Sequence, residues 1–244
     1  MEAISARIRL IEELAANAWP AAVQQQLEGW RLRATSNVTR RANSVLPLGP
    51  LPTYARWRDE VADFYARRDL PLCFQVSDVA PPELDTLLAA EGYQAEATTS
   101  VQTAPCVTLL EATAGGTAYE TEAFDALDPG WLDAFMAVED IDRAKRPVYC
   151  GILGAIGPRA RFVQVLADGC VAGVGMAVTE RGWTGLFNIA TAPAYRQRGV
   201  ATAILRALAE WSRAQAAPDL YLQVMTSNAP GLHLYNRSGF RHLY

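Results

Sequence analysis

The spacing of apolar residues along the chain changes between the helical period of three to four and the strand period of two. Residues 1–20 place apolar side chains on one side of a helical pattern that also carries acids, which predicts an amphipathic helix. The apolar members of that side are Ile4, Ile8, Ile11 and Leu14. Segment 29–36 alternates between apolar and polar residues, and segment 40–48 resembles its partner in a predicted β-hairpin.

The rest of the first half continues this mixture of periods. The predicted elements are a helix over 53–68, a strand over 70–78, a helix over 81–93 and a strand over 98–110. A run of small residues at 112–118 then predicts a linker. We therefore expect one domain over residues 1–112 and a second over residues 113–244.

The second half begins with a predicted strand and helix and continues as a meander of three strands. The predicted elements are a strand over 118–124, a helix over 129–142, strands over 160–167, 170–180 and 183–191, a helix to about residue 215, a strand over 219–227 and a helix over 228–240. Asp168-Gly169 and Arg181-Gly182 are good short-hairpin turns between the meander strands.

The ends of the two halves are alike. Residues 73–94 can be laid on residues 221–241, each as an apolar strand, a polar turn with proline, a leucine-rich helix and a glycine next to an aromatic residue. Internal duplication explains this pattern, and convergent strand-turn-helix patterning is the alternative. The expected fold class is α+β, with two similar halves, each a mostly antiparallel central sheet flanked by helices.

Composition limits the classes of function. The 244-residue chain has a net charge of −4 and is half hydrophobic, which is ordinary for a globular enzyme and argues against a nucleic-acid partner. No signal peptide or membrane span is apparent, so we expect a cytoplasmic protein with no membrane partner. Four scattered cysteines and two histidines predict reduced thiols and no metal site.

A candidate phosphate site follows the strand that ends at Thr191. A proline turn leads into a glycine-containing loop and then a helix, whose unpaired N–H groups and dipole attract a phosphate or pyrophosphate. Gly199 and Ala201 are small enough for the backbone to approach such a ligand. The residues expected to hold it are Arg196, Gln197, Arg198, Gly199, Val200, Ala201 and Thr202.

Other phosphate or nucleophile motifs are excluded. No GxxxxGK[ST] loop is present, and Gly173-Val174-Gly175 has Val178 where a dinucleotide fingerprint needs glycine. Residues 151–157 have the wrong glycine spacing and are predicted to form a loop. Ser238 lies outside a GxSxG elbow, so a hydrolase nucleophile is not expected.

The second half resembles the GNAT superfamily of acyl-CoA-dependent N-acyltransferases. The resemblance rests on the Ala192-Pro193 turn, on [RQ]xxGx[GA] at 196–201, and on Asn228 followed by Tyr235. The first half has no such loop and resembles a degenerate copy, as in tandem members of the superfamily. Members with this fold act on antibiotics, polyamines, amino acids, protein N-termini and lysines, so the resemblance does not choose the acceptor.

The resemblance implies acetyl-CoA as co-substrate, bound by the second half. Ile189 and Thr191 would pair with the pantetheine amides, and a backbone N–H at that strand end would stabilise the oxyanion. Tyr235 would touch the cofactor and act as general acid, because a phenol with a pKa of about 10 is protonated at neutral pH. Asn228 would contact the cofactor and cap its helix.

An alkyl amine acceptor, whether a small molecule or a peptide, is protonated at pH 7 and needs a base. Glu139, Asp140 and Asp142 are candidates, and Glu139 is our choice among them. The expected reaction is direct attack of a primary amine on acetyl-CoA in a ternary complex. A non-catalytic acyl-CoA-binding regulatory module is the alternative function.

The superfamily sheet normally continues beyond the tyrosine-bearing helix, whereas this sequence ends four residues after Phe240. The sheet could be completed by residues 98–106 of the first half, which is our choice, or by a partner subunit in a homodimer. A chain that ends early is the third alternative. An open edge strand would otherwise invite association.

Overall fold

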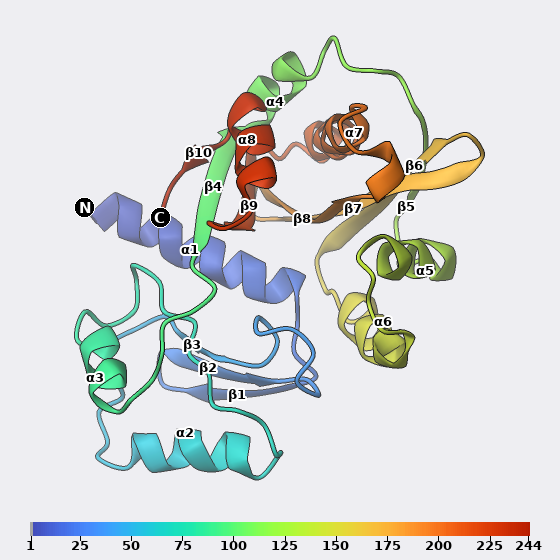
Figure 1. The fold of residues 1–244 in the computed structure, drawn as a ribbon. Helices are drawn as coiled ribbons and strands as arrows, with labels where there is room; N and C mark the ends of the chain where they lie inside the picture. Colours follow the sequence, from blue (N-terminus) through green and yellow to red (C-terminus); the bar gives the residue numbers. More distant parts are fainter. Residues whose placement is uncertain (1) are drawn as a thin grey trace. The chain divides into compact units, whose positions relative to one another are not determined.

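The computed structural model describes residues 2–244, and the chain forms two compact units (Figure 1). Unit 1 contains residues up to Glu96 together with Pro147–Ala155 and Tyr244, and unit 2 contains Ala97–Arg146 and Ile156–Leu243. Residues 97–112, which the sequence pattern places in the first domain, belong to unit 2. The chain thus leaves unit 1 earlier than the 112/113 boundary, and the division into two GNAT-like domains stays a prediction.

Unit 1 begins with a long helix and a small antiparallel sheet in the order β1-β2-β3. Its elements are α1 (Glu2–Ala18), β1 (Val23–Leu27), β2 (Trp30–Ala34), β3 (Val45–Pro47), α2 (Trp57–Ala66) and α3 (Leu84–Ala90). The predicted hairpin is confirmed by the pairing of β2 with β3. Strand β1 was not predicted, because its three glutamines give no apolar alternation.

The core of unit 1 is aromatic. Trp30 is fully buried and packs edge-on against Trp57 and Phe74, with ring centroids 5.0 and 6.3 Å away. Its indole N–H donates to the carbonyl oxygens of Gly49 and Pro50, so the buried polar group is satisfied.

The predicted strand over 70–78 is wrong. Only an isolated parallel bridge between Val45 and Phe74 forms there, through N–H groups of Val45 and Gln75. Strand β3 is three residues long and offers no longer edge to pair with. The apolar side chains of this segment pack against the core of unit 1 without a ladder.

Unit 2 is built on a seven-stranded sheet in the order β10-β4-β9-β8-β7-β6-β5. Every neighbouring pair is antiparallel except β8 and β9, which are parallel. The strands are β4 (Thr99–Pro105), β5 (Glu120–Phe124), β6 (Arg159–Ala167), β7 (Cys170–Glu180), β8 (Trp183–Thr191), β9 (Asp219–Met225) and β10 (Arg241–His242). The predicted meander of β6, β7 and β8 is confirmed, and the mixed sheet confirms the α+β class.

Helices cover both faces of this sheet (Figure 1). The helical elements of unit 2 are α4 (Cys106–Ala112), α5 (Pro129–Val138), η1 (Arg143–Lys145), η2 (Pro193–Tyr195), α7 (Val200–Ala214) and α8 (Ala229–Arg237). Val163 of β6 packs in a cluster with Ile204 and Leu208 of α7. The neighbouring Phe162 instead meets Trp131 of α5 at 4.9 Å. Successive strand residues point to opposite faces, so α5 and α7 lie on opposite sides.

Strand β4 completes the sheet next to β9. It pairs along its whole length, from Thr99 opposite Met225 to Pro105 opposite Asp219, and β10 pairs on its other side. Our choice among the three alternatives for completing the sheet is thus confirmed. The predicted continuation of this strand beyond Pro105 is wrong: helix α4 begins at Cys106, and Leu109 and Leu110 join the apolar cluster under α7.

Residues 151–157 do not form the predicted loop throughout. Helix α6 (Arg146–Gly154) includes the first four of them, and Ile152 and Leu153 are buried. Glycine at the helix end obscured an apolar helical pattern that begins earlier. Among residues 2–244, no helix is both long enough and apolar enough to span a bilayer.

Candidate functional site

Strands β8 and β9 separate halfway along their length. They pair from Trp183 opposite Asp219 to Leu186 opposite Leu222, and both strands continue beyond this point without pairing to each other. A bulge accompanies the separation, because the β7–β8 register shifts where Asn188 adopts a left-handed φ of 53°. A bulge increases local twist and bends its strand, so β8 turns away from β9.

The free edge of β8 is provided by Ile189 and Thr191. The N–H of Ala192 donates to the carbonyl of Ala172 on the β7 side at 2.9 Å. Backbone groups alternate in direction along a strand, so those of Ile189 and Thr191 point away from β7, into the opening beside β9. The carbonyl of Thr191 also accepts a hydrogen bond from Arg196 Nε at 3.4 Å.

The phosphate-loop candidate ends on an uncapped helix. Gly199 is the N-cap of α7 with a φ of 88°, and no side chain accepts a hydrogen bond from the first turn. Helix geometry leaves the N–H groups of a first turn without intrahelical partners, and the dipole makes that end positive. The first turn of α7, over Val200, Ala201 and Thr202, therefore offers donors suited to a phosphate group.

The same loop is braced by Tyr119, which the sequence pattern places in the strand over 118–124, and by Thr117, which it places in the linker over 112–118. The phenol of Tyr119 donates to the carbonyl of Arg198 at 2.7 Å. A Cβ placed on Gly199 would lie 3.4 Å from Thr117 Oγ1. Both residues precede β5, and no local pattern links them to a loop so much later in the chain. A contact between residues this far apart does not change the spacing of apolar residues along the chain, so the sequence pattern cannot reveal it.

The predicted loop residues divide by exposure. Arg196, Gln197 and Arg198 are exposed, and the guanidinium of Arg198 lies 5.6 Å from the ring centre of Tyr195. Val200 is fully buried in the cluster under α7, so its side chain supports the loop from below. The loop thus presents polar side chains and backbone to solvent and anchors itself through one apolar residue.

Helix α8 carries the candidate acid. Asn228 caps it, accepting a hydrogen bond from Gly231 N at 3.0 Å, which confirms the predicted capping role. Tyr235 is half-buried, packs on the same apolar cluster as Ile189, and meets Phe240 edge-on at 5.9 Å. Burial, and secondarily the charge of Glu139, raises the pKa of Tyr235 to about 12.

Glu139 stands out among the three candidate bases. It is the C-cap of α5 at the surface, where partial desolvation raises its pKa and the charge of Arg196 opposes that rise. Asp142 accepts a hydrogen bond from Ala144 N at 2.9 Å and caps η1 instead. The structure therefore brings Glu139 into the electrostatic neighbourhood of both Tyr235 and Arg196.

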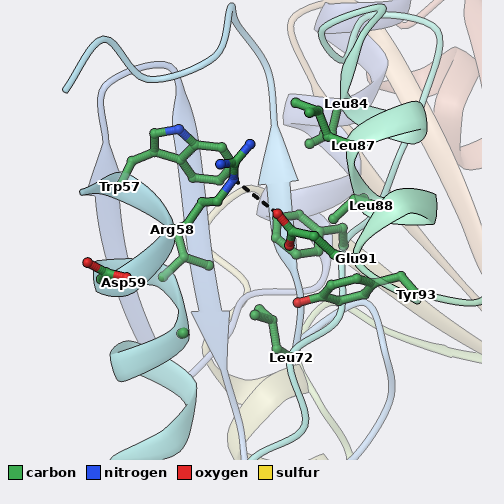
Figure 2. A pocket seen from close by; sticks show the side chains of 12 residues that line it. Trp57, Arg58, Asp59, Leu72, Leu84, Leu87, Leu88, Glu91 and Tyr93 are labelled. Atoms are coloured by element: carbon green, nitrogen blue, oxygen red, sulfur yellow. Dashed lines mark ion pairs between the residues drawn. The ribbon is translucent and has the colours of Figure 1, made fainter. Parts of the chain in front are cut away.

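A separate cavity lies in unit 1, between α2 and α3 (Figure 2). Its volume is about 180 Å³, and leucines and aromatic rings make up most of its wall. An ion pair of 3.2 Å between Arg58 and Glu91 lies at its edge. Ligand pockets generally measure roughly 300–1,000 Å³, so this cavity is too small for a nucleotide-sized ligand.

Comparison with known proteins agrees with this geometry. The family described as "Probable histone acetyltransferase Rv0428c C-terminal" matches residues 5–244. A Bacillus subtilis protein called "Uncharacterized N-acetyltransferase YobR" is 31% identical over 233 residues, covering 96% of this chain and 94% of the relative. The chain belongs to this family of GNAT acetyltransferases.

Solved GNAT structures share the fold along nearly the whole chain. A GCN5-related N-acetyltransferase from Kribbella flavida superposes with a TM-score of 0.71 at 14% identity, covering 98% of this chain and 91% of its own. A tandem GNAT protein from the clavulanic acid biosynthesis pathway gives 0.63 at 16% identity, covering 95% and 84%. At such identities the likeness establishes the fold.

As a GNAT acetyltransferase, the protein is an acyl-CoA-dependent enzyme, and its own residues fit that ligand. The uncapped N-terminus of α7 suits a pyrophosphate, and the left-handed glycine before it leaves the backbone accessible. The edge formed by Ile189 and Thr191 suits the amides of an extended pantetheine arm, as an added strand would.

Proposed function

We propose that the protein transfers an acetyl group from acetyl-CoA to a primary amine by direct attack in a ternary complex. The observation that carries this proposal is the opening between β8 and β9. It adjoins the uncapped α7 N-terminus through the Pro193 turn, and Ile189 on its edge packs on the same cluster as Tyr235. In this proposal the binding groups and the proton donor would act at one opening.

Acetyl-CoA would be held mostly by backbone. The N–H groups of residues 198–202 would bind its pyrophosphate, with Arg196, Gln197 and Arg198 adding side-chain contacts. Ile189 and Thr191 would pair with the pantetheine, and Asn228 would flank it from α8. A thioester supplies an electrophilic carbonyl and a thiolate leaving group with a pKa of about 8.5.

Glu139 would take the proton that the attacking amine must lose. An alkylammonium has a pKa near 10, far above that of an ordinary carboxylate, so raising the pKa of Glu139 improves it as a base. The charge of Arg196 opposes that rise in pKa and so favours the ionised carboxylate that a base requires.

Tyr235 would protonate the departing sulfur. With a pKa of about 12 it is fully protonated at neutral pH, although such a phenol is a weak acid. When Glu139 accepts the amine proton, its negative charge disappears, and with it one cause of the raised pKa of Tyr235. Base and acid would thereby assist each other through one electrostatic contact.

The acceptor class is a small-molecule or peptide amine. Acidic side chains cluster at the end of α5, where Glu139 is followed by Asp140 and Asp142, and favour a cationic acceptor.

Strand β4 already completes the sheet beside β9, so no partner strand is needed at that position. Homodimer formation stays a prediction.

Thiol release from acetyl-CoA tests the proposal. The full chain would be assayed with n-butylamine, spermidine, an aminoglycoside and a lysine-containing peptide, with CoA binding measured by calorimetry. We expect turnover with at least one amine and an acetylated product by mass spectrometry. Binding of CoA without turnover on any amine would support the regulatory module instead.

A further inference from the structure

We propose that Asn188 binds the acceptor, its amide oxygen accepting an N–H of the attacking amine. This assignment rests on the proposed function and adds a specificity-determining residue to it. It is supported by three features of Asn188: its place in the bulge, the face of the sheet it occupies, and the direction of its amide.

The bulge places Asn188 where the sheet opens. Its φ of 53° is left-handed, a conformation that asparagine tolerates better than most residues. Pairing between β8 and β9 ends at Leu186, two residues earlier. The backbone conformation and the opening therefore coincide at one residue with a polar side chain.

Asn188 lies on the face opposite Tyr235. Its side chain contacts Met176, which pairs with Phe187 and so shares the face covered by α5. Ile189 instead points toward α7, since a Cβ on Gly175 would meet both Ile189 and Ile204. Two consecutive residues of β8, Phe187 and Asn188, thus occupy one face, as a bulge allows.

The amide of Asn188 is oriented by a buried sulfur. Its Nδ2 donates to Met176 Sδ at 3.4 Å, and Met176 is completely buried. A thioether accepts weakly and cannot donate, so the oxygen turns away from it. Within residues 2–244, Asn188 Oδ1 has no hydrogen-bond partner, and the residue is half-buried. This oxygen is an oriented acceptor, and it is not among the buried side-chain atoms that lack a partner, so a donor can reach it from outside.

An amine approaching from the α5 face would supply that donor. The acceptor attacks as the neutral primary amine, after its ammonium proton has gone to bulk water. This form has two N–H groups and one lone pair, and one N–H bonded to Asn188 Oδ1 leaves the lone pair for the carbonyl carbon. A C–N bond forms as the C–S bond breaks. The surplus amine proton goes to Glu139, and the sulfur receives the Tyr235 proton. Water then returns both residues to their starting states.

The test compares Asn188→Gly, Asn188→Asp and a matched Asp168→Gly control. Glycine keeps the left-handed backbone and removes the amide, aspartate keeps an oxygen acceptor, and Asp168 has the same φ of 53° in a distant hairpin turn. We expect Asn188→Gly to lower kcat/KM for n-butylamine and spermidine about tenfold or more, the equivalent of one lost hydrogen bond. Asn188→Asp should restore most of it.

Binding is measured independently of turnover. The Kd of CoA should stay within about twofold of wild type in all three variants, because no contact to CoA is removed. In CoA-saturated protein, n-butylamine should shift the NMR signal of the Asn188 side-chain amide. Butyltrimethylammonium, which has the same charge and no N–H, should leave it unmoved.

The outcomes separate this inference from the proposed function. A wild type that releases no thiol with any amine contradicts the function itself. An active wild type whose kcat/KM for amines survives Asn188→Gly overturns the role of Asn188 alone. The role of Asn188 is also overturned if Asn188→Gly loses CoA affinity and amine turnover equally while Asp168→Gly loses neither. Asn188 would then only shape the bulge.

Discussion

The phenol of Tyr119 donates a 2.7 Å hydrogen bond to the backbone carbonyl of Arg198, 79 residues later in the chain. It ties the segment before β5 to the loop that precedes α7. With Thr117 beside Gly199, it holds the loop in the conformation that exposes the N–H groups of the helix start. A residue far from any motif thereby preorganises the candidate pyrophosphate site.

Tyr119→Phe should raise the KM for acetyl-CoA by about three- to tenfold, the effect of losing one hydrogen bond of roughly 0.5–1.5 kcal/mol. The kcat should change little, because Tyr119 contacts the loop and no reacting group. Steady-state kinetics with calorimetric CoA binding checks this. Tyr93→Phe in unit 1 is the matched control and should leave both constants unchanged.

Gly199→Ala should weaken CoA binding. A left-handed φ of 88° costs a residue with a Cβ about 1–2 kcal/mol, and relaxation of that strain would move the loop. Gly182→Ala imposes similar strain at a φ of 78° in a hairpin turn with nothing within 4 Å of the added Cβ. Both variants should lower the Tm, but only Gly199→Ala should weaken CoA binding. If Gly182→Ala lost as much CoA affinity as Gly199→Ala, the assignment of the loop to the cofactor would be contradicted.

Tyr235→Phe should lower kcat by about 10²-fold, in the range of general acid catalysis, with the Kd of CoA within twofold. The ring keeps its packing against Phe240 and loses only the proton that we assign to the sulfur. Single-turnover thiol release measures the chemical step directly. An unchanged rate would remove Tyr235 from the mechanism.

The pH profile should have an acid limb and no alkaline limb in the accessible range. Desolvation raises the pKa of Glu139, so the carboxylate, and with it kcat, is lost as pH falls through that raised value. The pKa of about 12 keeps Tyr235 protonated up to about pH 10. Glu139→Gln should abolish the acid limb and lower kcat at neutral pH by at least about tenfold. If the acid limb of the pH profile persists in Glu139→Gln, it reports the titration of a group other than Glu139.

The stability of unit 1 should depend on a series of buried hydrogen bonds that links four polar side chains. Tyr244 Oη donates to Glu12 at 2.8 Å, Gln75 Nε2 donates to Glu12 at 2.6 Å, and Arg33 donates to Gln75 at 2.8 Å. Glu12→Ala removes the buried carboxyl group whose charge faces the buried guanidinium of Arg33 and should cost about 3–5 kcal/mol of unfolding free energy. Tyr244→Phe should cost only about 1 kcal/mol. Urea unfolding of the full chain measures both.

The same series of hydrogen bonds should make the unfolding free energy depend on pH. Burial raises the pKa of Glu12, so the folded state holds its proton more tightly than the unfolded state does. The stability that this proton contributes is present at low pH and is lost as pH rises from the ordinary carboxyl value through the raised one. Glu12→Gln should flatten that slope, and an unchanged slope would assign it to other carboxyl groups.

Local patterns predicted most of unit 2. The strand alternation, the Asp168-Gly169 and Arg181-Gly182 turns and the glycine at the start of α7 act over a few residues, so they are visible in order along the chain. The sequence pattern missed helix α4 and the short strand β10, and it predicted a strand over 70–78 that does not form. Each of these depends on which neighbouring segment is present to pair or pack. Periodicity alone carries no information about that neighbour.

The sequence by itself determined the fold class, the helix-start loop at Gly199 and the Asn228 cap, because these follow from backbone preference and apolar spacing. Tertiary structure alone decided that Tyr119 braces Arg198, that Glu139 rather than Asp142 is electrostatically linked to Tyr235, and that Asn188 lies on the sheet face opposite Tyr235. Those relationships join residues far apart in sequence, and only the folded sheet brings their charges and hydrogen-bonding groups within reach.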